Sequence, residues 1–420
     1  MKIIADFHIH SFLSRATSKQ MNLEGVSNGA KIKGLNIVGT GDFTHPKWFN
    51  ELKNKLKPIE NSGLFEFNGI LFTLTSEVAT YFEVEGMMKR VHHVIHAPSF
   101  DVVNQINEAL KKYGDLASDG RPILNLSAAE LVEILIQIAN EILIYPAHAW
   151  TPWMSCFGSK SGFNSIEECY QDQVKHVFAL ETGLSSDPEM NWRLSSLDKF
   201  TLLSSSDCHS PHPWRLGREA NVFDLKKITY WEIFDAIKNK DKKSFLYTIE
   251  VDPNYGKYHF TGHRNCNVVL HPRDAIKLNN ICPKCHKKLT VGVLQRVEEL
   301  ADRPEGFVPK DAIPFKILLP LYEIISFAWG SGELYSKKVL EEHDKLIEKF
   351  GNELNILLNV SKEELLKVTN EKIANAIIKV REGKVKYQPG YDGNYGKPVF
   401  DENFEQKKEK FLSQKNLRQF

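Results

Sequence analysis

Short apolar runs alternate with helix-like segments over the first 215 residues of this 420-residue chain. Such alternation is typical of an α/β architecture built on parallel strands. Each run also contains, or is followed by, an acidic residue or a histidine. With those residues included, the seven runs are 3–10, 36–42, 71–77, 91–96, 142–148, 177–181 and 202–209. The pattern therefore predicts buried strands that deliver polar side chains to one edge of a sheet.

The first and last runs both end in a pair of metal-ligand residue types. His8 and His10 follow the first run, and Asp207 and His209 follow the last. Because alternate residues of a strand share a face, the members of each pair point the same way. One such pair is often a surface feature, whereas two pairs about 200 residues apart favour a common metal or phosphate site.

In a barrel of parallel strands, the loops at the carboxyl ends surround one mouth. Seven strands feeding that mouth would supply ligands for two or three metal ions, and mixed imidazole and carboxylate ligands suit zinc, manganese or iron. The candidate catalytic and metal-binding residues are His8, His10, Asp42, Glu77, His93, His148, Asp207 and His209. His45 is either a further ligand or a group behind one, and Glu181 is expected to orient a ligand or to serve the structure.

The net charge and the distribution of apolar residues limit which partners and which cell compartment we expect for this protein. The net charge of +1 at pH 7 excludes a uniformly basic surface, so any contact with nucleic acid must come from local patches. The sequence shows neither a signal peptide nor an apolar run of membrane length. We therefore expect a cytoplasmic protein, active as a monomer, with no membrane partner.

Three of the six cysteines fall between positions 266 and 285. His263-x2-Cys266 and Cys282-x2-Cys285 have the spacing of a closed structural zinc site. His263 has the right spacing for the fourth ligand, but His259, His271 and His286 compete for this place. A redox Cys-x-x-Cys motif is the alternative, and the βαβ pattern that usually surrounds such a motif is missing here.

The last third of the chain is expected to be helical. The pattern predicts a core helix over Phe315–Trp329, then helices from Ser336 to Phe350, after a Ser361–Glu364 capping box, and from Glu371 to Glu382. Their lysines and arginines would suit a DNA backbone or would simply face solvent. The tyrosines of residues 386–396 could stack on unpaired bases, and ordinary loop packing is equally compatible with them.

Two further features point towards partners. Gln414, Leu417 and Phe420 have the spacing of the short box by which DNA repair enzymes bind the sliding clamp, although a second aromatic residue is missing. Trp153, Trp192 and Trp214 lie close to the strand-end motifs. Each could line a pocket for a nucleotide turned out of the duplex, or could be an ordinary core residue.

The motifs of the first half resemble those of the PHP (polymerase and histidinol phosphatase) superfamily of metal-dependent phosphoesterases. In the family's order they are Asp6-Phe7-His8-Ile9-His10-Ser11, Thr40-Gly41-Asp42, Glu77, His93, Pro146-Ala147-His148 and Ser206-Asp207-Cys208-His209-Ser210. The resemblance implies a distorted seven-stranded (β/α) barrel with a multinuclear metal centre. We expect zinc in this centre and in the structural site, with Mg²⁺ or Mn²⁺ supporting activity.

Three positions qualify the resemblance. Many members have Asp-His where this chain has Asp42-Phe43, and many carry a further His or Asp where this chain has residues 14–17. The preference for His93 follows the resemblance, whereas His92 and His96 share the other face of the strand and are the alternative inward pair.

The order of motifs along the whole chain resembles the archaeal endonuclease Q family. This resemblance implies a repair enzyme that cuts DNA 5′ of deaminated bases, such as hypoxanthine and uracil, and of abasic sites, leaving a 3′-hydroxyl and a 5′-phosphate. The expected organisation is a PHP barrel over residues 1–235, a zinc-binding module with a connecting helix over 236–330, a helical DNA-binding domain over 331–405 and a clamp-binding tail over 406–420.

Two other functions remain compatible with the residues. A PHP phosphatase for a small phosphate monoester would use the first 215 residues and leave the zinc module and the helices without a role. A non-catalytic DNA-binding subunit would use the zinc module and would have an inactive barrel. The near-complete set of metal ligands argues against this function.

Overall fold

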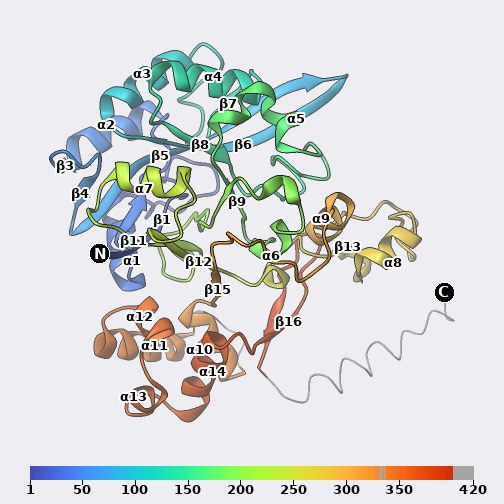
Figure 1. Ribbon diagram of the computed structural model, residues 1–420. Coiled ribbons are helices and arrows are strands. Elements are labelled where there is room, and N and C mark those ends of the chain that lie inside the picture. The colour runs from blue at the N-terminus through green and yellow to red at the C-terminus, as the bar shows by residue number, and fades with distance from the viewer. Residues whose placement is uncertain (331–333, 335, 401–420) are drawn as a thin grey trace.

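The computed structural model describes residues 1–330, 334 and 336–400 (Figure 1). A large sheet occupies the amino-terminal part, five helices (α10 to α14) lie below it in the view, and a small module containing β13 and α8 projects to the right. No helix in the described part of the chain is long and apolar enough to cross a membrane.

Eleven strands form the main sheet, in the order β15-β12-β11-β1-β2-β5-β4-β3, with β6 and β7 also paired to β5 and β8 paired to β6. Its strands are β1 (Lys2–Asp6), β2 (Ile37–Gly39), β3 (Lys57–Pro58), β4 (Phe65–Phe67), β5 (Ile70–Val84), β6 (Met87–Ala97), β7 (Ile123–Leu124), β8 (Leu143–Pro146), β11 (Ala220–Asp224), β12 (Phe245–Glu250) and β15 (Phe315–Ile317). A separate parallel pair consists of β9 (Ala179–Glu181) and β10 (Thr201–Leu203).

The strand pairing confirms the mixed α/β class. β1, β2 and β5 are parallel neighbours, as expected. The expectation of parallel strands throughout is wrong for β6, which runs antiparallel to both β5 and β8 because a tight turn at residues 85–86 joins it directly to β5. Within the described residues β8 forms no ladder with β9, so the hydrogen bonds do not close a seven-stranded barrel.

Helices flank this sheet, and local sequence explains where they begin. They are α1 (Leu23–Lys33), α2 (Pro46–Lys55), α3 (Phe100–Leu110), α4 (Ala128–Ile138), α5 (Ile166–Tyr170), α6 (Pro188–Asn191) and α7 (Tyr230–Lys238), with 3-10 turns at Gln171–His176, Ser195–Leu197, Pro253–Tyr255 and Arg264–Cys266. Ser127 and Glu130 form a capping box at the start of α4, and Gly34 ends α1 in the left-handed conformation (φ 96°).

The small module at the right of Figure 1 has little apolar core of its own. It contains the antiparallel strands β13 (Thr261–His263) and β14 (Val268–Leu270), followed by α8 (Pro272–Lys277) and α9 (Val293–Leu300). A separate cluster of four buried residues, Val268, Ala275, Cys282 and Leu289, forms its interior. Such a small core cannot supply much of the folding free energy, so the module needs another source of stability.

The single helix expected over Phe315–Trp329 is wrong in its first half. Residues 315–317 form β15, which pairs in parallel with β12, and α10 (Leu321–Ala328) begins only after Pro320. Proline lacks a backbone N–H, so it is accommodated at the start of this helix and not in its interior.

Three of the remaining carboxyl-terminal helices, α11, α13 and α14, begin where the sequence predicts them, whereas α12 is not predicted. The four helices are α11 (Lys337–Phe350), α12 (Glu353–Leu358), α13 (Lys362–Leu366) and α14 (Glu371–Arg381), followed by the hairpin of β16 (Lys386–Gln388) and β17 (Lys397–Val399). Ser361 and Glu364 form the predicted capping box. The clamp-binding motif at Gln414, Leu417 and Phe420 lies outside the described residues.

Candidate metal centre

Glu77 of β5 lies at the centre of a buried group of histidines and carboxylates. Its Oε2 atom is 3.2 Å from Nε2 of His10 and 3.5 Å from Nε2 of His8. Asp207 Oδ1 is 3.1 Å from the same Nε2 of His10. One ligand atom from each of these four residues lies within 4.8 Å of the others, which is close enough to hold a single cation.

The other oxygen of Glu77 faces a second group. Oε1 is 2.7 Å from Nδ1 of His92 and 3.1 Å from Nε2 of His148, and these three residues form another compact set of ligand atoms. Glu77 therefore belongs to two adjacent groups, with one oxygen directed at each. A carboxylate in this position can bridge two cations.

Residues behind the histidines fix which ring nitrogen faces the centre. Nδ1 of His8 lies 3.0 and 3.1 Å from the two oxygens of Glu181, and Nδ1 of His10 lies 3.2 Å from Asp42 Oδ1. Nδ1 of His148 lies 3.1 Å from Thr151 Oγ1. Such partners leave Nε2 of each ring directed at the centre, as is usual for metal-binding histidines.

The residues present fit divalent cations. Among the described residues, Nε2 of His8 is buried and has no hydrogen-bond partner, although it points at Glu77 and Asp207. A buried ring nitrogen without a partner is costly unless a cation or water completes it. Imidazole and carboxylate donors together suit zinc, manganese or iron. The geometry thus supports a metal cofactor without identifying the metal.

The electrostatics of the centre favour ligand forms of Glu77 and His92. Burial alone would raise the pKa of Glu77, but the adjacent His92 and Arg121 hold it well below its ordinary value. Burial lowers the pKa of His92 to about 4. Glu77 is therefore a carboxylate and His92 a neutral imidazole at neutral pH, which are the forms that bind a cation.

Three residues at strand ends adopt backbone conformations that are rare for residues other than glycine. The φ angles are 50° at Asp42, 30° at His148 and 46° at Asp207. Left-handed backbone at such positions is unfavourable and is typically found at functional sites, where the surrounding structure enforces it. The strain therefore coincides with the residues that the strand-end pattern singled out.

The structure brings most of the predicted residues together, but His93 and His45 lie elsewhere. The ring nitrogens of His93 form hydrogen bonds with other partners: Nε2 with Thr80 Oγ1 (2.9 Å) and Nδ1 with Tyr170 Oη (2.7 Å). The preference for His93 is therefore corrected in favour of His92. His45 accepts from the backbone N–H of Lys47 and caps α2, so it lies at neither ligand group.

Three further side chains surround the two groups. Asp42 lies behind His10, where it also accepts from the backbone and hydroxyl of Ser11. His209 stacks on His10 with 4.6 Å between ring centroids, and its Nδ1 lies 2.7 Å from Thr17 Oγ1. Sequence reasoning missed Arg121, whose Nη1 lies 3.0 Å from Glu77 Oε2. The side chains of Asp207, His209 and Arg121 are between 27% and 34% exposed, and so mark the open side of the centre.

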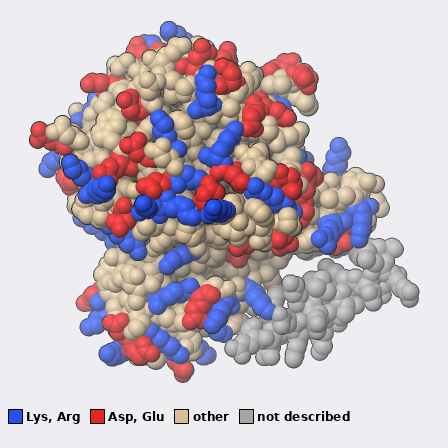
Figure 2. All heavy atoms as spheres, viewed as in Figure 1, with Lys and Arg blue, Asp and Glu red and all other residues tan. Residues whose placement is uncertain are grey.

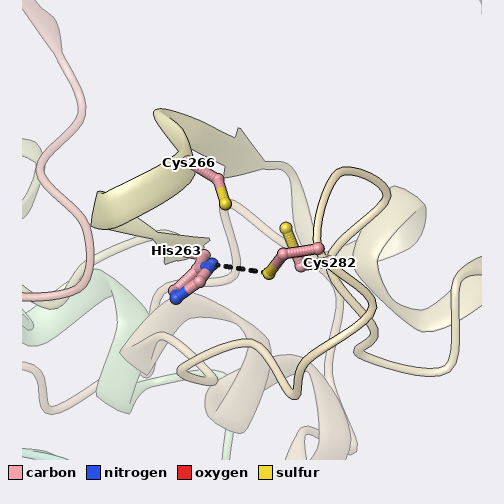
Figure 3. Close-up of side chains that lie close together, drawn as sticks. His263, Cys266 and Cys282 are labelled. Carbon is pink, nitrogen blue, oxygen red and sulfur yellow. Dashed lines mark hydrogen bonds between the residues drawn. The ribbon is translucent and has the colours of Figure 1, made fainter.

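The four residues of the predicted zinc site also converge. His263, Cys266, Cys282 and Cys285 offer ligand atoms within 4.8 Å of one another, and Figure 3 shows His263, Cys266 and Cys282 around a common point. Burial would raise the pKa of Cys282, but the backbone N–H groups of Cys285 and Lys284 lower it to about 6. The competing ligands lie elsewhere: His259 contacts Ser185, His271 caps α8, and His286 is exposed outside the group.

Comparison with known proteins finds one family and two relatives that are similar to this chain. A family described as the MJ0043 C-terminal domain matches residues 320–384. The uncharacterized protein MJ0043 of Methanocaldococcus jannaschii is 39% identical over 255 residues, which are 60% of this chain and 31% of that protein. The chain thus spans about a third of the length of this relative. The uncharacterized protein YqxK of Bacillus subtilis is 28% identical over 415 residues, covering 94% of this chain and 99% of that protein.

Two solved structures are similar over nearly the whole chain. The lesion-specific endonuclease PfuEndoQ from Pyrococcus furiosus has a TM-score of 0.86 and 37% identity, with 99% of this chain and 100% of that chain covered. Endonuclease Q in complex with a 27-mer duplex substrate, with an abasic lesion at its active site, has a TM-score of 0.86 and 38% identity, with 96% and 98% covered. At this identity and coverage, the chain belongs to the endonuclease Q family.

Proposed function

We propose that this protein is a metal-dependent DNA repair endonuclease that hydrolyses the phosphodiester bond 5′ of a damaged nucleotide. The proposed lesions are deaminated bases, namely hypoxanthine and uracil, and abasic sites, and the products carry a 3′-hydroxyl and a 5′-phosphate. The observation that carries the proposal is the position of Glu77 between two groups of metal ligands. Membership of a family with a lesion-specific endonuclease supports the choice of DNA as substrate.

The residues of the two ligand groups are the ones that would hold the cations. His8, His10, Glu77 and Asp207 would hold one, and Glu77, His92 and His148 would hold the other. Divalent cations held by these residues would supply activation of a water and stabilisation of the charge that develops on the departing oxygen. The imidazole-rich ligand set favours zinc or manganese at these positions, with added Mg²⁺ or Mn²⁺ supporting activity.

The remaining residues orient ligands and receive the phosphate. Glu181, Asp42 and Thr151 keep the rings of His8, His10 and His148 in one tautomer and one orientation. Arg121 holds Glu77 with one nitrogen, and its partly exposed guanidinium lies at the open side of the centre. A planar guanidinium at this position can donate to a phosphate oxygen that enters the centre.

DNA would be held by local basic patches, since the net charge is only +1. Figure 2 shows Lys and Arg side chains gathered on the small module at the right, where Arg273, Lys277, Lys287 and Lys288 are exposed. We propose that zinc stabilises the fold of this module, which in turn contacts the DNA backbone. The zinc would be bound by His263, Cys266, Cys282 and Cys285. Contact of the helical domain with DNA, and of the tail with the sliding clamp, remain predictions.

The experiment that tests the proposal uses four duplexes of one sequence, with a single hypoxanthine, uracil or abasic site, or with no lesion. Each is incubated with the protein and Mg²⁺ or Mn²⁺, and the broken bond and its end groups are mapped. We expect one cut 5′ of each lesion and none in the intact duplex. Asp207→Asn should abolish cleavage and retain DNA binding, whereas Asp172→Asn, at an exposed aspartate, should cut normally.

Two results would contradict the proposal. Retained cleavage by the Asp207→Asn variant would remove the assigned centre from the reaction. Hydrolysis of a generic aryl phosphate, with all four duplexes left intact, would favour a phosphatase acting on small monoesters.

A further inference from the structure

Trp153 is exposed beside the second group of metal ligands. Its exposed fraction is 44%, which is high for a large apolar side chain. The loop that carries it is tied to that group at two points. Thr151 Oγ1 is hydrogen-bonded to His148 Nδ1 (3.1 Å), and the backbone oxygen of Met154 accepts a hydrogen bond from the N–H of His92 (3.0 Å). The loop that carries Trp153 is therefore held against His92 and His148.

Hydrogen bonds within the loop hold the backbone on both sides of Trp153. Thr151 Oγ1 donates to the backbone oxygen of Trp153 at 3.0 Å, and Ser155 Oγ donates to the backbone oxygen of Thr151. Met154 has a φ of 59°, a left-handed conformation that is unfavourable for methionine. Its N–H donates to Ser161 Oγ at 3.3 Å, which helps to hold this conformation. An exposed tryptophan on a loop held by these hydrogen bonds is better placed to bind a ligand than to pack in the core.

A second aromatic residue from the zinc-binding module lies against Trp153. The rings of Trp153 and Tyr258 are edge-to-face, with 5.5 Å between centroids and 70° between planes. Lys257 Nζ lies 5.5 Å from the centre of the Tyr258 ring and 5.8 Å from that of Tyr395, which is 45% exposed. Trp153, Tyr395 and Lys257 are exposed and Tyr258 is half-buried, so three aromatic residues and a cation lie together at the junction of the catalytic part and the module.

The positions of Tyr258 and Tyr395 are set by a backbone network. The N–H of Val293 donates to the oxygen of Tyr258, and the N–H of Gly393 donates to the oxygen of Lys257, both at 2.9 Å. Asp392 accepts from the N–H of Arg264 and from the hydroxyl of Thr290, both at 2.7 Å, and so joins the tyrosine-rich loop to the zinc module. The aromatic surface is therefore continuous with the folded core of the module.

We propose that Trp153 and Tyr258, with Lys257, form a platform on which an unpaired base stacks while the neighbouring phosphodiester lies in the metal centre. The inference rests on the proposed function, because it takes a lesion-bearing duplex as the ligand. Aromatic rings stack on any base, and a lysine beside them neutralises the adjacent phosphate. At a lesion, the base opposite an abasic site has lost its partner and is free to stack there. Trp192 is buried and Trp214 packs on His212 and Tyr322, so neither replaces Trp153.

The test uses the full chain and a duplex in which 2-aminopurine lies opposite a single abasic site. Its fluorescence falls when the base stacks on a protein ring, and fluorescence anisotropy gives the affinity in the same sample. Mg²⁺ and Mn²⁺ are left out to prevent cleavage, and no chelator is added, so that the module keeps its zinc. We expect the unmutated protein to quench the signal. Trp153→Ala should lose the quenching and about tenfold in affinity for this duplex, and Trp153→Phe should keep most of both.

The matched control is Trp231→Ala. Trp231 is 41% exposed on α7, whose Tyr230 contacts Glu141 before β8, whereas His148 follows β8 at the opposite end of the strand. This variant should behave as the unmutated protein. Tyr258→Ala provides a second variant on the module side, with the same expected direction, and thermal unfolding checks that each variant is folded.

The outcomes separate the two claims. If Trp153→Ala and Tyr258→Ala quench and bind as the unmutated protein does while all of them cut the lesion duplex with Mn²⁺, the platform is refuted and the proposed function stands. If the unmutated protein binds and cuts no lesion duplex, the proposed function itself fails. Equal loss of affinity for lesion and intact duplexes, without a change in quenching, would also refute the platform, because it would assign these residues to general backbone contact.

Discussion

Both carboxylate oxygens of Glu181 lie within 3.1 Å of Nδ1 of His8, so Nε2 is the ring nitrogen left for a cation. Glu181→Gln would weaken this hold and allow the ring to turn or to change tautomer. We expect a 10- to 100-fold loss of metal affinity, with the fold intact and activity restored at higher metal concentration. Metal titration followed by activity assays measures this, with Glu189→Gln at an exposed site as the control. Unchanged metal affinity would show that Glu181 has no such role.

His92 and His93 are neighbours with opposite expected phenotypes. His92→Asn removes a ligand of the second group, so it should reduce the bound metal per chain and lower kcat by at least tenfold. His93→Asn should leave the metal in place and lower the stability, because Thr80 and Tyr170 would lose buried hydrogen bonds worth about 1–3 kcal/mol together. Metal analysis and thermal unfolding of both variants distinguish them. Loss of metal from the His93 variant alone would reverse the assignment.

A buried ion pair joins the carboxyl-terminal helices to the catalytic part. Lys33 Nζ of α1 lies 2.7 Å from Oε1 of Glu353, at the start of α12. Lys33→Met would leave this carboxylate buried without its cation, which is expected to lower the free energy of unfolding by about 3–5 kcal/mol. The double variant Lys33→Met/Glu353→Gln should recover part of this loss in denaturant unfolding. Additive losses would mean that the two side chains do not interact.

The same pair makes the docking of the helices depend on pH. Burial alone would raise the pKa of Glu353, but the charge of Lys33 outweighs it and lowers this pKa below the ordinary 4.5. The stabilisation is therefore complete above pH 4.5 and is lost as the pH falls through the lowered pKa. Unfolding measured between pH 7 and pH 3 should show this loss, and Glu353→Gln should flatten the profile. An identical profile for the variant would exclude Glu353 as the cause.

The small module should depend on its metal. Its buried apolar cluster has four members, and structural zinc sites contribute about 10–16 kcal/mol of apparent binding free energy to such folds. We expect Cys282→Ser, or a chelator, to expose the amides of residues 261–290 to hydrogen exchange while β1 and β5 stay protected. Full protection of the module after removal of all metal would contradict a structural zinc site.

The sequence predicts the metal ligands at the strand ends better than it predicts the other residues that surround the metal centre. His8, His10 and Asp207 come from motifs at the ends of buried runs, and the structure places them in one group. The choice between His92 and His93 could not be made from the pattern, because β6 is buried on both faces from Val91 to Ala97 and alternation carries no information there.

Long-range contacts explain the other differences. Arg121 lies in a polar turn that begins with Asp119 and Gly120, and only the fold brings it to Glu77, 44 residues earlier in the chain. The start of α10 differs for a local reason: the apolar run from Phe315 reads as one helix, although its first residues pair with β12 and Pro320 separates the two parts. The spacing of His263, Cys266, Cys282 and Cys285 needed no such context, because zinc ligands occur at characteristic intervals.

Glu77 is proposed to serve both cation sites of the centre that cuts DNA at a lesion. The most direct measurement compares the unmutated protein with Glu77→Gln for metal content per chain and for cleavage of a duplex with one abasic site. We predict two cations at this centre beyond the zinc of the module, and one cut 5′ of the lesion. The variant should lose at least one cation and nearly all cleavage while still binding the duplex. Cleavage by Glu77→Gln at the unmutated rate, with the metal content unchanged, would show that Glu77 does not hold the cations that the reaction needs.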